Sequence, residues 1–369
     1  MRNAVAVPRF RAEHIGSLLR PKKLTEAFRA NRTDQITIHE LNAARDEAIR
    51  EAVALQEELG FQAVTDGEFR RASYWSHLVG AIEGLTVQPS LFDFRDDKGE
   101  KQAFIAPHIR GRLARGRSFS ADELAFLAKA TKRTAKITMP SPSTLHFWRG
   151  REAINPAAYR DLNSFFADLA AVFRAEIAEL AKQGCTYVQI DEVPLTMMCD
   201  PKVCAALRQR GEDPDLLISF YVATLNAAVQ DRPKTMTVGV HMCRGNFRGK
   251  WLAEGGYEPV AERVLGGLEV DHFLLEFDSP RAGDFAPLRF VPKDKGVVLG
   301  LVCSKTSVLE KLDDLRQRVD EAAKHVPVER LAVSPQCGFA SGEVGNPLTP
   351  EEQEAKLRTV AAVARKVWG

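Results

Sequence analysis

The stretch LNSFFADLAAVFRAEIAELAKQG (162–184), followed at once by CTYVQIDEV (185–193), indicates the fold. The first part has apolar residues at i, i+3 and i+4 spacing and ends at Gly184, which is typical of an amphipathic helix with a glycine cap. The second part is short and apolar and ends in Asp191 and Glu192. A helix that leads directly into a buried strand is the repeating unit of an α/β protein with parallel strands.

The same unit repeats along the chain in both directions. A second amphipathic helix is expected over IHELNAARDEAIREAVALQEELG (38–60). The candidate strands are 12–19, 61–68, 136–144, 185–193, 236–243, 272–279, 296–304 and 330–338. Eight β/α repeats predict a closed (β/α)8 TIM barrel rather than an open sheet.

The whole chain, residues 1–369, is expected to form a single barrel domain, because no low-complexity segment or Pro/Ser-rich linker divides it. Residues 84–135 are polar and interrupted by Pro and Gly, and do not fit the repeat. They are predicted to form an insertion between strands two and three, a hairpin or lid above the barrel mouth. A further excursion over 196–217 follows strand four.

Composition excludes several classes of protein. The 51 basic and 49 acidic side chains give a net charge of +2, so no basic nucleic-acid surface is expected. No stretch approaches about 18 uninterrupted apolar residues, and the N-terminus lacks an apolar signal region, which predicts a cytoplasmic protein without a membrane span. In that compartment the six cysteines are expected to be thiols that are buried, reactive or metal-bound.

Residues able to do chemistry gather at the carboxyl ends of the predicted strands. In a (β/α)8 barrel these ends face one mouth, where active sites of this architecture lie. The residues are Asp66, Glu68, Asp191, Glu192, His241, Cys243, Glu276, Asp278, Cys303 and Cys337.

His241 and Cys243 lie two positions apart, so on a strand both side chains point to the same face. With Cys337 and a carboxylate such as Glu276 they make an N, S, S, O donor set, which suits tetrahedral Zn²⁺. The alternative is a buried cysteine beside a core histidine, because free cysteines are mostly inert core residues. The second thiol at another strand end, directly before Gly338, favours the metal site.

The carboxylates of strands two and four have two interpretations of equal weight. Asp66 and Glu68, and likewise Asp191 and Glu192, could bind a substrate ammonium or act as general acid or base. They could instead cap the following helices or pair with nearby arginines such as Arg70 and Arg71. Trp148, after strand three, is a candidate platform for a flat ligand, although an aromatic residue there is more often packing.

The segments HIGS (14–17), DGE (66–68), SPSTLHFW (141–148), QIDE (189–192), HMCRGNF (241–247) and SPQCGFAS (334–341) resemble the catalytic barrel of cobalamin-independent methionine synthase. The similarity extends from about His14 to the last helix and is strongest to short single-barrel bacterial proteins called methionine synthase II-like. The wider group contains the uroporphyrinogen decarboxylase and methionine synthase barrels.

The resemblance implies a zinc-dependent methyltransferase of methionine synthesis, with zinc held by His241, Cys243, Glu276 and Cys337. It also implies that Glu68 and Asp191 contact the amino-acid part of a thiol substrate such as homocysteine, with Ser17 near its carboxylate. Zn²⁺ would hold the substrate thiol as a thiolate, which attacks the methyl group of a methyl-folate or methylcobalamin-type donor. Asp191 or Glu192, with His146 as an alternative, is the candidate acid for the leaving group.

Two features differ from the family pattern. Cys303 stands where the family has a substrate-contacting histidine at strand seven, and the N-terminal half that helps to hold polyglutamyl folate has no counterpart in this sequence. Alternatives are therefore a thiol alkyltransferase resembling epoxyalkane:coenzyme M transferase, a metal-free porphyrin decarboxylase, or a zinc- and thiol-binding barrel without turnover. The sequence leaves open a methyl-carrier protein as partner and a homo-oligomeric state.

Overall fold

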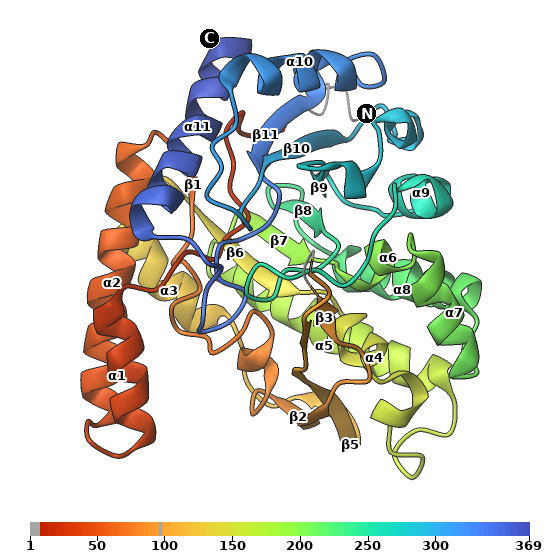
Figure 1. Cartoon of the computed structure of the whole chain (residues 1–369). Helices are drawn as coiled ribbons and strands as arrows, with labels where there is room; N and C mark the ends of the chain where they lie inside the picture. Colours follow the sequence, from red (N-terminus) through yellow and green to blue (C-terminus); the bar gives the residue numbers. More distant parts are fainter. Residues whose placement is uncertain (1–7, 96–97) are drawn as a thin grey trace.

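A computed structural model describes residues 8–95 and 98–369 and shows a curled parallel sheet with helices outside it (Figure 1). The sheet has seven strands in the order β1-β6-β7-β8-β9-β10-β11, and each paired strand runs parallel to its neighbour. The strands are β1 (Ala63–Val64), β6 (Thr134–Pro140), β7 (Tyr187–Asp191), β8 (Thr237–Met242), β9 (His272–Glu276), β10 (Gly296–Val302) and β11 (Leu331–Pro335). This curled sheet confirms the prediction of a TIM-like barrel.

The eighth position of the barrel is occupied by the segment predicted as strand 12–19, which does not form a regular strand. It makes a single parallel bridge to β11 at Ala12 and Val333. On its other side, the Thr65 hydroxyl donates to the Gly16 carbonyl oxygen at 2.7 Å, and the Leu18 amide donates to the Gly67 carbonyl oxygen at 3.1 Å. The prediction of a regular strand over 12–19 was therefore wrong. The segment has one bridge in place of a ladder of backbone hydrogen bonds, and side chains make part of its contacts with the neighbouring strands.

Polar side chains inside the barrel hold this segment in place. Glu13 and Lys136 form a fully buried ion pair at 3.1 Å, and the Tyr187 hydroxyl donates to Glu13 at 2.7 Å. The Lys136 ammonium also donates to the Gln189 side chain at 3.0 Å. Each buried charge therefore has partners, which burial away from water requires.

The outer helices follow the predicted alternation. They are α2 (Ile38–Glu58), α3 (Ala121–Ala130), α5 (Leu162–Lys182), α8 (Pro214–Val229), α9 (Glu258–Leu265), α10 (Leu312–Ala322) and α11 (Pro350–Trp368). Additional helices are α1 (Lys22–Arg32), α4 (Thr144–Phe147), α6 (Pro194–Met197) and α7 (Pro201–Gln209), with 3-10 turns at η1 (Ser76–Leu78), η2 (Gly150–Ala153), η3 (Pro280–Ala282), η4 (Ala286–Phe290) and η5 (Val328–Arg330). Thr37 and Thr349 begin α2 and α11 with capping boxes.

The region predicted as an insertion at 84–135 contains two antiparallel hairpins and one barrel helix. β2 (Ile82–Pro89) pairs with β5 (Ile105–Arg115), and β3 (Phe94–Arg95) pairs with β4 (Lys101–Gln102). In Figure 1 the β2–β5 hairpin lies apart from the sheet, at the bottom of the view. The helix α3 and the first two residues of β6 fall within 84–135 but belong to the α/β repeat, so the irregular part ends before residue 121.

Candidate metal and substrate site

Three potential metal-ligating residues meet at the carboxyl ends of two strands. His241 is near the end of β8, Cys243 follows it directly, and Cys337 follows the end of β11. One ligand atom from each lies within 4.8 Å of the others, and all three residues are buried. The two sulfur atoms are 3.7 Å apart. The structure thus brings together three residues that are distant in sequence, and their role as metal ligands stays a prediction.

The imidazole of His241 is oriented for metal binding. Its Nδ1 lies 3.1 Å from the Leu274 carbonyl oxygen, so that nitrogen carries the proton and donates it. Its Nε2 is buried and has no hydrogen-bond partner among the described residues. A buried nitrogen lone pair beside two sulfur atoms is a donor set that fits a divalent ion such as Zn²⁺.

Interaction between the two thiols separates their pKa values. The hydrogen bond with Cys243 holds the pKa of Cys337 well below its ordinary value, against the opposing effect of burial. The same hydrogen bond and burial raise the pKa of Cys243. The pair thus already favours one thiolate, the form in which cysteine binds metals.

Glu276 lies next to these three residues but its carboxylate is turned elsewhere. Oε2 accepts a hydrogen bond of 2.5 Å from the Arg244 backbone amide, and Oε1 lies 3.6 Å from the Lys305 ammonium. Burial raises the pKa of Glu276, but Lys305 and Arg244 lower it more, so the group is ionised. Oε1 makes no hydrogen bond within the described part of the chain. The Glu276 carboxylate is therefore not part of the three-residue group, although its Oε1 is not used in a hydrogen bond within the described residues.

A small cavity of about 50 Å³ is lined by His241, Cys243 and Cys337; we call it the inner cavity. Its lining includes His241, Cys243 and Cys337 together with the predicted substrate residues Ser17, Glu68, Asp191 and Trp148. Four of the five predicted substrate residues thus share one cavity with the thiols.

The two carboxylates of the inner cavity are held by fixed partners. Glu68 accepts a hydrogen bond of 2.8 Å from the Thr138 hydroxyl and has a positive φ of 61°, an unusual conformation for a residue other than glycine. The Gln189 amide donates to Asp191 at 2.7 Å. Burial raises the pKa of Glu68 and raises that of Asp191 to about 7.

Ser17 lies against the turn that carries Cys337. A Cβ atom added to Gly338 would lie 2.0 Å from the Ser17 oxygen, so only glycine permits this approach. The Asn246 side chain donates to the Gly338 carbonyl oxygen at 2.8 Å and joins the loops that follow β8 and β11. This bond keeps the two cysteine-bearing loops together.

Besides Glu276, three of the predicted ligand, substrate and acid residues lie outside the lining of the inner cavity: Glu192, His146 and Cys303. Glu192 accepts hydrogen bonds from the Ser143 hydroxyl at 2.6 Å and the Leu195 amide at 2.9 Å, so both its oxygens serve the local structure. His146 Nδ1 lies 2.8 Å from the Tyr221 hydroxyl, and burial lowers the His146 pKa to about 3. Neither residue is in position to protonate a leaving group.

Cys303 lines a separate neighbouring cavity of about 580 Å³ together with Asp278 and Lys305. Burial raises the pKa of the Cys303 thiol to about 11, so it stays protonated at neutral pH. The structure thus does not bring Cys303 to the inner cavity where a substrate contact was predicted.

Tyr74, Phe94 and Asn246 line the inner cavity but were not predicted from the sequence. Tyr74 and Phe94 come from the loop after β1 and from β3, where no residue pattern marks a site. The signal for Asn246 was its place in the segment HMCRGNF (241–247).

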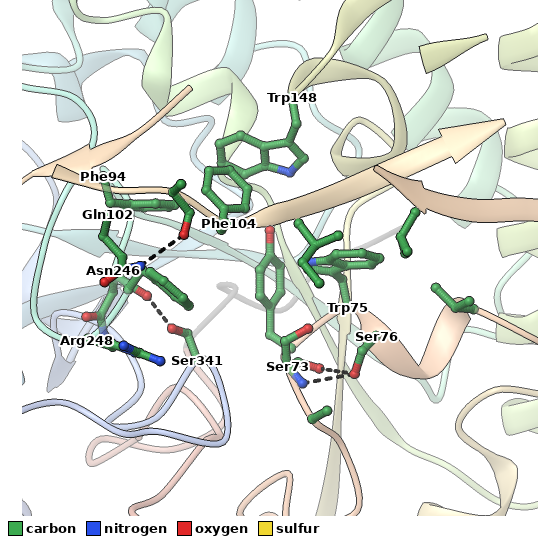
Figure 2. A pocket seen from close by; sticks show the side chains of 17 residues that line it. Ser73, Trp75, Ser76, Phe94, Gln102, Phe104, Trp148, Asn246, Arg248 and Ser341 are labelled. Atoms are coloured by element: carbon green, nitrogen blue, oxygen red, sulfur yellow. Dashed lines mark hydrogen bonds between the residues drawn. The ribbon is translucent and has the colours of Figure 1, made fainter. Parts of the chain in front are cut away.

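A larger chamber of about 490 Å³ shares Tyr74, Phe94, Trp148, Asn246 and Ser341 with the inner cavity; we call it the outer chamber. Figure 2 shows Phe94, Asn246 and Arg248 on one side of it and Trp75 and Ser76 on the other, with Phe104 and Trp148 close together between them. The rings of Phe104 and Trp148 meet edge to face with centroids 4.9 Å apart. Trp148 is thus buried against Phe104 and lines both spaces.

The fold and the site define a barrel protein with an imidazole and two thiols at the mouth where the strands end. The chain belongs to the family described as the catalytic domain of cobalamin-independent synthases, whose model matches residues 10–366. Over 97% of its length it is 39% identical to the uncharacterized protein YxjH of Bacillus subtilis, of which the match covers 95%.

Names that state a function appear among less similar relatives. The chain is 23% identical to a methionine synthase of Sulfolobus acidocaldarius, over 88% of this chain and 84% of that one. A Listeria monocytogenes structure assigned as a vitamin-B12-independent methionine synthase is 30% identical and matches with a TM-score of 0.76, over 98% of this chain and 99% of that one. Across residues 8–95 and 98–369, no helix combines the length and apolar composition needed to cross a bilayer.

Proposed function

We propose that this protein is a zinc-dependent S-methyltransferase that methylates a small amino-acid thiol, homocysteine or a close analogue. The observation that carries the proposal is that His241, Cys243 and Cys337 share one cavity with Glu68 and Asp191. The names of the relatives, methionine synthase among them, support the same reaction class.

The metal would be held by His241, Cys243 and Cys337, with Glu276 as fourth ligand. All four residues are buried at the ends of barrel strands. His241, Cys243 and Cys337 already lie together, whereas Glu276 would have to turn its Oε1, which makes no hydrogen bond within the described residues, towards them. Zn²⁺ bound there supplies Lewis acidity that stabilises a thiolate at neutral pH.

The substrate's amino-acid end would be bound by Glu68, Asp191 and Ser17. Two buried carboxylates suit an ammonium group, because an ion pair in a site shielded from water is stronger than one on the surface. The Ser17 hydroxyl, held against Gly338, would bind the carboxylate. A substrate bound in this way would have its sulfur towards Cys243 and Cys337.

In the transfer, an S–C bond forms while the bond between the methyl group and the donor atom breaks, and that bond's electron pair leaves with the donor. The thiol loses one proton and the leaving donor atom gains one. Asp191 is the carboxylate in the inner cavity suited to take up the first proton and supply the second. Glu192 and His146 have no part in this step.

The test is metal analysis combined with transfer assays. Purified protein is expected to contain one zinc per chain and to convert homocysteine to methionine with methyl-folate or methylcobalamin. Asp191→Asn should reduce the rate by at least about 100-fold, the usual size of a general acid–base contribution, while zinc is retained. Zinc without transfer from either donor would instead indicate a binding protein or another alkyl donor, and a protein without zinc would exclude the proposal.

A further inference from the structure

The carboxylate of Glu68 is held by a chain of hydrogen bonds that begins at Arg71. The Arg71 Nη1 donates to the Thr138 hydroxyl at 3.1 Å, and this hydroxyl donates to Glu68 Oε1 at 2.8 Å. A guanidinium can only donate hydrogen bonds, so the Thr138 oxygen is the acceptor in the first contact. The single proton of the hydroxyl is therefore left for Glu68.

Arg71 is itself fixed by a second carboxylate. Its Nε and Nη2 donate to the two oxygens of Glu123 at 2.8 and 2.5 Å, and Nη2 also donates to the Thr138 carbonyl oxygen at 2.7 Å. Glu123 lies in the first turn of α3, and the side chains of this pair are 1% and 6% exposed. Because a bidentate pair sets the plane of the guanidinium, the direction of Nη1 towards Thr138 is also set.

The backbone that carries Glu68 is fixed as well. The Arg20 side chain donates to the carbonyl oxygen of Glu68 at 3.0 Å and to that of Arg71 at 2.6 Å. The Arg71 amide donates to the Glu68 carbonyl oxygen at 3.1 Å. With the backbone and Oε1 both held, Oε2 of Glu68 is the oxygen left for a ligand of the inner cavity.

The charges of this group do not balance. Arg71 faces two carboxylates, because Nη1 lies 3.6 Å from Glu68 Oε1 while Nε and Nη2 bind Glu123. Burial raises the pKa of Glu68, and Arg71 followed by the Thr138 hydrogen bond acts in the opposite direction. Two acids that share one cation leave one negative charge, and Glu68 is the member that lines the inner cavity. A further cation is therefore suited to this cavity.

We propose that Arg71 is a positioning residue for substrate binding: through the Thr138 hydroxyl it holds Glu68 as an ionised carboxylate directed at the ammonium group of the thiol substrate. This inference rests on the proposed function. Arg71 and Thr138 do not line the inner cavity, so they act on the substrate only through Glu68. Pairing of Glu68 with an arginine and binding of an ammonium group are then parts of one arrangement, which selects amino-acid thiols over thiols without an amino group.

A double variant with a matched control tests the role of Arg71. Loss of Arg71 alone would leave Glu123 buried without its cation, which destabilises a fold. Arg71→Met is therefore combined with Glu123→Gln, and Glu123→Gln alone is the control. The KM for homocysteine should be at least about tenfold higher in the double variant than in the control, with kcat within about threefold and zinc retained, because a charge-assisted hydrogen bond is weakened. Equal KM values would overturn the proposal.

The hydroxyl of Thr138 is tested by two substitutions of that residue. Thr138→Val removes the hydroxyl at similar size, and Thr138→Ser keeps it. The KM for homocysteine should rise at least about tenfold in Thr138→Val and stay within about threefold of the parent value in Thr138→Ser. Equal KM values in these two variants would exclude the hydroxyl as the link between Arg71 and Glu68.

A second thiol separates this role from a general loss of structure. 4-Mercaptobutanoate is homocysteine without its amino group, so it has no ammonium for Glu68 to bind. Its KM should differ by less than about threefold between the double variant and the Glu123→Gln control. An equal rise in KM for both thiols would indicate a structural role and overturn the proposal.

The ionisation of Glu68 gives a measurement that needs neither zinc nor turnover. The charged and titratable groups that face Glu68 are Asp66 and Arg71 of its own loop, Arg20 before α1, Glu123 of α3, Asp191 of β7, and His241, Cys243 and Cys337 across the inner cavity. The double variant and its control differ only in Arg71, so the other groups affect both equally.

Infrared difference spectra, each taken against the same protein with Glu68→Gln added, report the protonation of Glu68 alone. Its midpoint should lie at least about one pH unit higher in the double variant, because a cation within about 4 Å favours the carboxylate. Equal midpoints would overturn the proposal whether or not the protein transfers methyl groups. Failure of the proposed function would show instead as missing zinc or missing transfer, with the difference in midpoints intact.

Discussion

Replacing Cys337 by alanine gives the sharpest test of the metal site. The Cys337 sulfur lies 3.7 Å from that of Cys243, and both are buried with His241. Zinc bound by four protein ligands is stabilised by about 10–16 kcal/mol in peptide models, or about 3 kcal/mol per ligand. Because 1.4 kcal/mol corresponds to a tenfold change, Cys337→Ala should weaken zinc binding by about 100-fold.

The assay is competition for zinc against a coloured chelator, with metal content measured after equilibration in buffered zinc. The control is Cys204→Ala, because Cys204 is a half-buried thiol that donates to the Met198 carbonyl oxygen at 3.3 Å and lies outside the three-residue group. Circular dichroism must show that both variants are folded. If Cys337→Ala binds zinc with the affinity of the parent protein, the assigned ligand set is wrong.

Three further substitutions separate the roles of other residues. Glu68→Gln should raise the KM for the thiol substrate about 10- to 100-fold and leave bound zinc unchanged, because a charge-assisted hydrogen bond to the substrate ammonium is lost. Loss of zinc in this variant would instead identify Glu68 as a metal ligand. Gly338→Ala should lower the free energy of unfolding in urea by about 1–3 kcal/mol, because its Cβ would lie 2.0 Å from the Ser17 oxygen; equal stability would show that the turn relaxes. His146→Gln should give a kcat within about threefold of that of the parent protein, because the His146 ring is hydrogen-bonded to Tyr221 and does not line the inner cavity. A fall in kcat of about 100-fold would instead indicate that His146 is the general acid.

The sequence predicted the barrel because the repeat pattern of a barrel can be recognised without tertiary detail. Alternation of amphipathic helices with apolar strands specifies parallel strands, and parallel strands bring their carboxyl ends to one mouth. His241, Cys243, Glu276 and Cys337 could therefore be assigned to one mouth from their positions, whereas their grouping as metal ligands came from their donor chemistry and the family resemblance. A regular strand was wrongly predicted for segment 12–19. Its conformation depends on contacts with residues distant in sequence, such as the Glu13–Lys136 ion pair and the hydrogen bond from Thr65 to Gly16.

What the sequence determined by itself is thus which side chains reach the mouth of the barrel. Tertiary structure alone decided which of them face a common space, because that depends on rotamers and on hydrogen bonds between distant loops. It directed Glu192 and His146 to Ser143 and Tyr221, and it turned Glu276 towards Arg244 and Lys305. It also brought side chains of the insertion, of the loop after β1 and of the loops after β6, β8 and β11 together around one chamber beside the thiols.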